Sequence, residues 1–298
     1  MTASTDFLPP GLLEHLGGLE IIAKTIVRGF QAGVHRSPLR GAGEDFAKHR
    51  DYQQGDDVRY LDWKLYARTD RLYVREFEER SNLQSYVVVD ASASMDYGGA
   101  GGVTKLRYGS YVAAALAHLM IGGGDAVGLA AFGAEPRLLL GPRARKGHLH
   151  DLLLNLERLR PGGHGGVAEV LDRVGVAMRR GGRVVVISDL LEDDGGDALV
   201  AAAGRLRARG DEVIVMRILT PEESGEAAPD AGLFFDPEHP ARQVPASPRQ
   251  DAGYARRVAA YYASIAGRLR ERGVEYVPLS TAQPVEQALV AWVNRRRG

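Results

Sequence analysis

The stretch Ser85–Asp96, SYVVVDASASMD, decides the fold of this chain. Its first half, Ser85–Asp90, is a run of apolar and β-branched residues that ends on an aspartate, which is typical of a short buried strand. Lys105–Ile121 follows with apolar residues at helical spacing. A second apolar run, Arg183–Asp189 (RVVVISD), also ends on an aspartate. Strands that are apolar throughout predict a parallel sheet with helices on both faces.

The same alternation of strands and helices continues to the end of the chain. Further strands and helices are expected at Asp125–Phe132, Gly147–Leu159, Val167–Arg180, Asp197–Arg209, Glu212–Ile218, Gln250–Arg272, Val274–Leu279 and Pro284–Arg297. Arg137–Leu140 follows a proline and predicts one antiparallel edge strand. Residues 220–247 are rich in proline, glycine and acids, so we expect an excursion there, with a small hairpin at Leu233–Phe235. The fold class is therefore α/β, with a doubly wound, mostly parallel sheet over residues 85–298.

Residues 1–84 do not show this alternation of strands and helices. Gly18–Phe30 has the spacing of an amphipathic helix, and only Arg71–Phe77 alternates like a strand. The stretch between them is polar and rich in aspartate and arginine. We expect residues 1–84 to form a helix and an irregular extended arm that packs on the main domain.

Composition excludes several classes of function. The 38 basic and 38 acidic residues cancel, so net charge favours neither nucleic acid nor a membrane surface. The chain has no cysteine, which excludes disulfides, thiolate metal sites and cysteine catalysis. No basic segment followed by an apolar core opens the sequence, and no apolar run reaches the ~20 residues that span a bilayer. These features predict a cytoplasmic protein without a membrane span.

The residues that could carry chemistry follow the two strands that end on aspartate. In an open α/β sheet, ligands bind at the carboxyl ends of the strands, at the point where strand order reverses. Asp90 is followed by Ser92 and Ser94, and Asp189 ends the later strand. These carboxylates and hydroxyls are hard oxygen donors that suit Mg²⁺, Mn²⁺ or Ca²⁺ and not zinc. The alternative is a purely structural role for this segment, as a tight turn that caps a helix.

The two strand ends and their loops, VVVDASASMD and VVVISDLLED, resemble the von Willebrand factor A fold and its metal-ion-dependent adhesion site. A longer upstream pattern resembles the signature of the DUF58 family. It comprises Gly43, Asp45, Phe46, Arg50, Tyr52, Gly55, Asp56, Asp57, Arg59, Asp62, Trp63, Ala67 and Arg68. Together these resemblances cover roughly residues 30–290.

The resemblance implies a partner and a metal site. Members of the family often accompany MoxR-type AAA+ ATPases, and the pair is thought to assemble or mature other protein complexes. The adhesion-site motif maps onto Asp90, Ser92, Ser94 and Asp189, which would hold Mg²⁺ or Mn²⁺. The family pattern also has a threonine where this chain reads Gly162–Gly166 (GGHGG), with Gly165 or His164 at its place. One hydroxyl ligand is therefore missing, and octahedral Mg²⁺ tolerates incomplete geometry poorly.

The Asp/Arg-rich stretch allows two interpretations. Its charged side chains can form bidentate ion pairs that fix an irregular arm, or they can form a recognition surface for the ATPase. We favour the first interpretation, and we expect Trp63 to be packed with its indole N–H bonded.

Three functions remain open from the sequence. The favoured one is a non-enzymatic module that binds a protein, an ATPase of MoxR type or its client, through the Asp90 face. The second is a metal-dependent hydrolase that uses Asp90 and Asp189 to activate water. The third is a structural subunit whose metal site has decayed. No nucleophile elbow, phosphate-binding lysine loop or HExxH motif is present in the sequence.

Overall fold

The structure is a computed structural model, and it describes residues 18–34, 45–52, 61–78, 83–99, 102–135, 137–235, 237, 241 and 243–295. A six-stranded sheet lies at its centre, in the order β10-β7-β6-β3-β4-β5. The strands are β3 (Gln84–Asp90), β4 (Ala126–Phe132), β5 (Arg137–Arg143), β6 (Arg183–Ser188), β7 (Glu212–Leu219) and β10 (Glu275–Ser280). All neighbours pair in parallel except β4 and β5. The predicted mostly parallel sheet with one antiparallel edge strand is confirmed.

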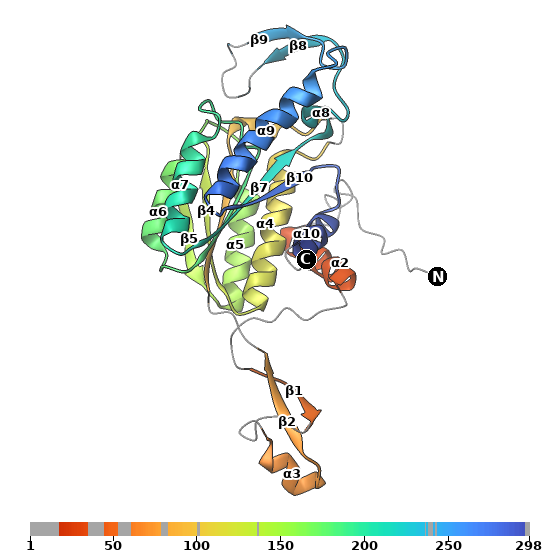
Figure 1. Ribbon diagram of the computed structural model, residues 1–298, viewed down its shortest axis with the longest axis vertical. Coiled ribbons are helices and arrows are strands. Elements are labelled where there is room, and N and C mark those ends of the chain that lie inside the picture. The colour runs from red at the N-terminus through yellow and green to blue at the C-terminus, as the bar shows by residue number, and fades with distance from the viewer. Residues whose placement is uncertain are drawn as a thin grey trace, which may run out of the picture.

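Helices cover both faces of this sheet (Figure 1). One face carries α2 (Leu19–Val34), α4 (Lys105–Gly122), α5 (Lys146–Arg158) and α10 (Val285–Arg295). The other carries α6 (Val167–Ala177), α7 (Asp197–Ala208) and α9 (Tyr254–Glu271). Successive residues of β3 alternate between the two cores: Val87 and Val89 contact the first, Tyr86 and Val88 the second. This is the doubly wound α/β fold that the apolar strands predict.

The strand order reverses between β3 and β6. Counted from β3 as the first strand, the order reads 3-2-1-4-5-6, so the chain leaves β3 toward one edge and later returns to the opposite side. Asp90 is the last residue of β3, and Asp189 directly follows β6. The two aspartates therefore lie at the switch point of the sheet, where doubly wound proteins bind ligands.

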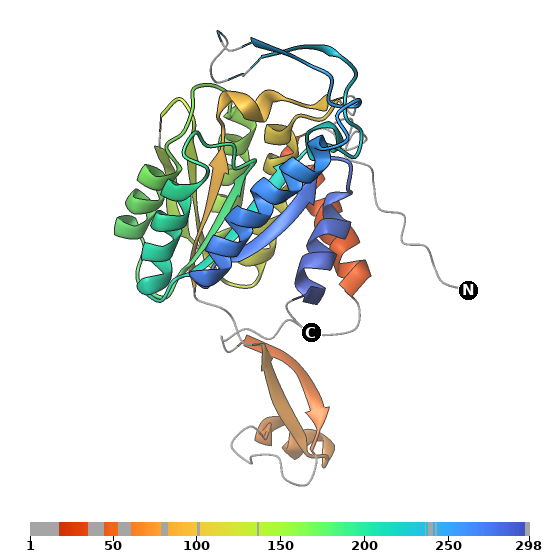
Figure 2. The same ribbon diagram turned by 45° about the horizontal axis from the view of Figure 1, so that its top comes forward.

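The N-terminal region divides into two parts, which differs from the arm that we expected to pack on the main domain. Helix α2 belongs to the core, because its apolar stripe, including Ile22, Ile26 and Phe30, is buried against α4 and α10. The hairpin of β1 (Asp45–Asp51) and β2 (Tyr73–Glu78), with α3 (Trp63–Thr69), instead projects away from the sheet (Figures 1 and 2). Two buried apolar residues of this hairpin, Leu61 and Val74, pair with each other in a β-bridge, so they are covered within the hairpin and not by the sheet.

The expected excursion at residues 220–247 is present after β7. It contains a short helix, α8 (Pro221–Ser224), and a small antiparallel hairpin of β8 (Gly232–Phe235) and β9 (Gln243–Ala246). The hairpin lies at the end of the molecule that also carries the loop after β3, opposite to the β1–β2 hairpin (Figure 2). In the described residues, no helix is long and apolar enough to cross a membrane.

Candidate functional site at the switch point of the sheet

The loop after β3 brings Asp90, Ser92 and Ser94 together. The backbone N–H of Ser92 donates to Oδ1 of Asp90 at 2.8 Å, and the hydroxyls of Ser92 and Ser94 lie 3.0 Å apart. A 3₁₀ turn, η3 (Ala93–Asp96), follows directly and keeps the loop compact. All three side chains belong to buried residues, so the predicted donors lie beneath the molecular surface.

Residues Gly162–Gly166, where the family pattern has its threonine, lie directly against this loop. The N–H of Ala93 donates to the carbonyl of Gly163 at 3.0 Å, and the N–H of Gly162 donates to the carbonyl of Ala91 at 2.9 Å. A Cβ on Gly163 would lie 2.3 Å from Cα of Ala134, and the φ angle of this glycine is +69°. Glycine is therefore required there by close backbone approach. Within this loop no side chain supplies a hydroxyl, since His164 is exposed and the other four residues are glycines.

Ser188, which the sequence analysis did not single out, joins the two predicted aspartates. Its hydroxyl donates to Oδ2 of Asp90 at 2.5 Å and accepts the N–H of Leu190 at 2.9 Å. Burial, and then the nearby charge of Asp189, raises the pKa of Asp90 to about 7, although the hydrogen bonds from Ser188 and Ser92 act in the opposite direction. The position of Ser188, next to a strand-ending aspartate, is the signal that could have identified it.

Lys105 is the second residue that the sequence analysis missed. Its ammonium Nζ donates to Oδ2 of Asp189 at 2.7 Å and to Oε1 of Glu223 at 2.5 Å. Its side chain is 0% exposed. Burial by itself lowers the pKa of Lys105, but the carboxylates of Asp189 and Glu223 outweigh it, so the pKa is raised. Lys105 is therefore an ammonium ion inside the protein and cannot act as a general base at neutral pH.

One feature of the sequence could have singled out Lys105. The residue opens α4, where the positive end of the helix dipole disfavours a cation, and apolar residues follow it. A lysine that is buried at such a position needs a compensating carboxylate. Its partners could not be identified from sequence, because Asp189 lies 84 residues away and Glu223 lies 118 residues away.

The donor set does not fit a divalent ion well. Oδ1 of Asp189 accepts the N–H of Leu191 at 3.1 Å and Oδ2 is paired with Lys105, so this predicted ligand is already neutralised. Both carboxylate oxygens of Asp90 also accept hydrogen bonds. Asp90 and the two serine hydroxyls therefore remain as candidate ligands, one carboxylate fewer than the motif supplies, whereas Mg²⁺ prefers carboxylate ligands in octahedral geometry. Among the residues that the structure describes, no three His, Asp or Glu side chains form a group that could hold a metal ion.

Glu223 reaches Lys105 from α8, which is held firmly in place. Its other oxygen, Oε2, accepts the N–H of Thr220 at 3.0 Å, and the N–H of Glu223 donates back to the hydroxyl of Thr220 at 3.2 Å, which completes a capping box. The hydroxyl of Tyr254, at the start of α9, donates to the carbonyl of Glu223 at 3.3 Å. The carboxylate of Glu223 is therefore positioned by its own helix and by α9.

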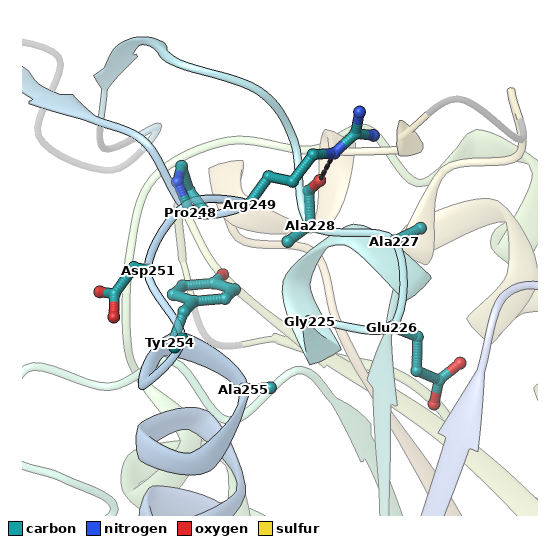
Figure 3. Close-up of a pocket in the computed structure, with 10 residues that line it drawn as sticks. Gly225, Glu226, Ala227, Ala228, Pro248, Arg249, Asp251, Tyr254 and Ala255 are labelled. Carbon is teal, nitrogen blue, oxygen red and sulfur yellow. Dashed lines mark hydrogen bonds between the residues drawn. The ribbon is translucent and has the colours of Figure 1, made fainter.

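A pocket of about 280 Å³ lies beside α8, between the turn after this helix and the start of α9 (Figure 3). Figure 3 shows the ring of Tyr254 under this turn, and Nε of Arg249 donates to the carbonyl of Ala228 at 3.2 Å. A second pocket, of about 440 Å³, lies between β4, β5 and α5 and includes Ala91. Asp90, Ser92, Ser94 and Asp189 line neither pocket, so the predicted donors do not open into these two cavities.

Comparison with known proteins identifies the family. The model for "Protein of unknown function DUF58" matches residues 48–247 of this chain. The chain belongs to the DUF58 family. Two relatives, uncharacterized proteins of Mycobacterium tuberculosis and Mycobacterium bovis, are each 31% identical over 300 residues, which cover 98% of this chain and 92% of the relative.

Two solved structures also resemble this DUF58 chain. One is the conserved hypothetical protein BatB from Bacteroides thetaiotaomicron, with 16% identity, a TM-score of 0.46, and coverage of 72% of this chain and 98% of that one. The other is an aerotolerance-related membrane protein from Bacteroides fragilis with multiple mutations to serine. It has 16% identity and a TM-score of 0.45, and the match covers 72% of this chain and 99% of that one.

Much of the DUF58 signature lies outside the described residues, including Asp56, Asp57 and Arg59. Within the described part, Asp62 accepts the N–H of Leu65 at 3.0 Å and so caps α3, which is a structural role. The prediction that Trp63 is packed is wrong: Trp63 is 59% exposed. It lies on α3 of the projecting β1–β2 hairpin, where its ring meets Tyr66 edge-on at 6.3 Å.

Proposed function

We propose that this DUF58 chain is a non-enzymatic protein-binding module, a cytoplasmic adaptor that works with a MoxR-type AAA+ ATPase in assembling or maturing other protein complexes. Family membership supports this role, because the resemblance to this family implies that the chain works with a MoxR-type ATPase. The surface around the switch point supports the binding function itself. We place the contact at this end of the sheet.

One observation carries the proposal: large apolar side chains are exposed around the switch point. Tyr97 follows the Asp90 loop and is 39% exposed, and Leu191 follows Asp189 and is 44% exposed. On the β8–β9 hairpin at the same end of the molecule, Leu233 is 63% exposed and Val244 is 60% exposed. We call these four residues the apolar rim. Exposed apolar side chains of this kind can be buried in contact with a partner protein.

The hairpin part of the rim has no core of its own. Leu233 pairs with Pro245 and Phe234 pairs with Val244, so Leu233 and Val244 point to opposite faces of the two strands. A two-stranded hairpin is marginally stable by itself in water. A partner that covers this hairpin would bury apolar surface on it and add to its stability.

The hydrogen bonds of the two aspartates support a binding role over the hydrolase alternative. A hydrolase needs a carboxylate or a metal-bound hydroxide that can take a proton. Asp90 is buried and held by Ser188 and Ser92, Asp189 is paired with Lys105, and neither aspartate lines either of the two pockets described above. These bonds serve to hold the loops at the end of the sheet.

The test is a binding measurement between the full chain and the purified MoxR-type ATPase of the same organism. The rim variant combines Leu233→Ser with Val244→Ser, two substitutions at exposed positions that leave the core intact. Burial of such anchor residues contributes on the order of 1–2 kcal/mol to binding. We therefore expect the dissociation constant to rise roughly tenfold or more in the rim variant.

Two matched controls locate the contact. Val176→Ser removes an equally apolar residue that is 90% exposed on α6, away from the rim, and should leave binding unchanged. Trp63→Ala alters the exposed aromatic pair at the opposite end of the molecule. Unchanged affinity in the rim variant, with binding lost in Trp63→Ala, would contradict the placement of the contact at the rim.

A further inference from the structure

Lys105 connects three elements that meet at the switch point. It opens α4, and its ammonium bonds Asp189 after β6 and Glu223 on α8. The side chains of Lys105 and Asp189 are 0% and 1% exposed, and that of Glu223 is 21% exposed. The positive charge therefore lies inside the protein and not on its surface.

Burying this charge requires compensation. Removing an ammonium and a carboxylate from water costs several kcal/mol each, and close carboxylates repay that cost only when the geometry is good. Lys105 has two carboxylate partners at hydrogen-bonding distance from separate parts of the chain. The helix dipole of α4 adds no stabilisation, because it disfavours a cation at this end. The two acidic partners thus form a built site for one cation, which the lysine itself occupies.

We propose that Lys105 supplies the positive charge that a divalent ion supplies in a metal-ion-dependent adhesion site, so that this end of the protein binds its partner without a metal. Glu223, from the chain's own α8, is the second carboxylate on that charge. A partner's acidic side chain therefore finds no open coordination position, and recognition falls to the apolar rim. The inference rests on the proposed function only for the location of the contact.

The test uses Mn²⁺ alone and needs no partner, so its failure is distinct from a failure of the proposed function. Isothermal titration of the full chain with Mn²⁺ should show no binding below millimolar concentration. In Lys105→Ala the ammonium is absent, and Asp189 and Glu223 are left facing each other beside the Asp90 loop. This variant should bind Mn²⁺ roughly tenfold or more tightly than the unmodified chain, because affinity rises with the number of charged ligands.

Two further variants test whether the gain in Mn²⁺ affinity depends on the carboxylates that Lys105 contacts. The double variant Lys105→Ala with Asp189→Asn should lose the Mn²⁺ binding, because one of the exposed carboxylates is removed. Lys24→Ala breaks an exposed pair with Glu20 and should gain nothing. If Lys105→Ala does not fold, Lys105→Gln retains most of the side-chain length and replaces it in the comparison. Sub-millimolar Mn²⁺ binding by the unmodified chain, or no gain in any folded Lys105 variant, would overturn the proposal.

Discussion

The ammonium Nζ of Lys105 lies 2.7 Å from Oδ2 of Asp189, and both side chains are buried. Asp189 follows the strand that neighbours β3, so this ion pair lies beside the loop that carries Asp90. The sequence motif suggests a cation held by two aspartates and two serines. In the structure the cation bound to one of those aspartates is a lysine of the same chain.

The first prediction concerns the stability that this ion pair contributes. Lys105→Met keeps the apolar volume and removes the charge, which leaves buried carboxylates unpaired. Breaking a buried pair in this way costs about 3–5 kcal/mol. Urea denaturation at neutral pH should show that loss. Lys24→Met breaks an ion pair whose side chains are both about half exposed and should cost less than about 0.5 kcal/mol; equal losses in the two variants would contradict the assignment.

The second prediction concerns Ser188. Ser188→Ala removes the hydroxyl that donates to Asp90 and leaves the N–H of Leu190 without its acceptor. A buried donor that loses its partner costs about 1–3 kcal/mol. Ser110→Ala is the matched buried control: its hydroxyl donates only to the Leu106 carbonyl within α4, so the change should be close to neutral. A Ser188 variant as stable as the Ser110 variant would show that the Asp90 loop does not depend on this bond.

The third prediction is a pH dependence from Asp90. Its pKa is raised from 3.8 to about 7, so the folded state holds its proton more tightly than the unfolded state. The charged form is therefore disfavoured in the fold, and stability is lost as pH rises from about 4 to about 7. Asp90→Asn removes this dependence. Between pH 5 and pH 8 the stability of Asp90→Asn, relative to the unmodified chain, should rise by roughly 2–3 kcal/mol.

Chemical denaturation at both pH values checks this prediction. Asp251→Asn serves as a control, because the Asp251 carboxyl is exposed and its bond to Arg257 lowers its pKa. Asp251 is thus ionised across the whole interval, and its variant should keep the pH dependence of the unmodified chain. A constant stability difference between Asp90→Asn and the unmodified chain at pH 5 and pH 8 would refute the raised pKa of Asp90.

The fourth prediction concerns Gly163. Gly163→Ala would place a Cβ 2.3 Å from Cα of Ala134 and also strain a backbone with φ of +69°. Gly181 has φ of +79° with nothing within 4 Å, so Gly181→Ala tests the strain alone, about 1–2 kcal/mol. Gly163→Ala should be clearly the more destabilising in thermal unfolding, because the loop that accepts the N–H of Ala93 must move. Equal losses in the two variants would mean that the close approach has no cost.

The central sheet could be predicted from sequence because its strands are apolar on both faces. Ser85–Asp90 and Arg183–Asp189 match β3 and β6 to within one residue at each end. Strand β1 was missed, since DFAKHRD shows neither apolar character nor alternation. Its backbone pairs with β2, which has an alternating pattern of its own.

The candidate site was predictable only in part. Asp90, Ser92 and Ser94 lie together because five consecutive residues form one tight loop. The pairing of Asp189 and Glu223 with Lys105 depends on how β6, α8 and α4 meet in the tertiary fold, and no local pattern encodes that meeting. Trp63 was wrongly expected to pack, because apolar character alone does not show whether a neighbouring core exists.

The most direct test of the account is a crystal of the unmodified chain soaked in Mn²⁺, with anomalous scattering recorded from the metal. We expect no manganese peak beside Asp90, Ser92 and Ser94, and Nζ of Lys105 should still be bonded to Asp189. A manganese peak coordinated by Asp90 and the two serine hydroxyls, with Lys105 displaced from Asp189, would contradict it.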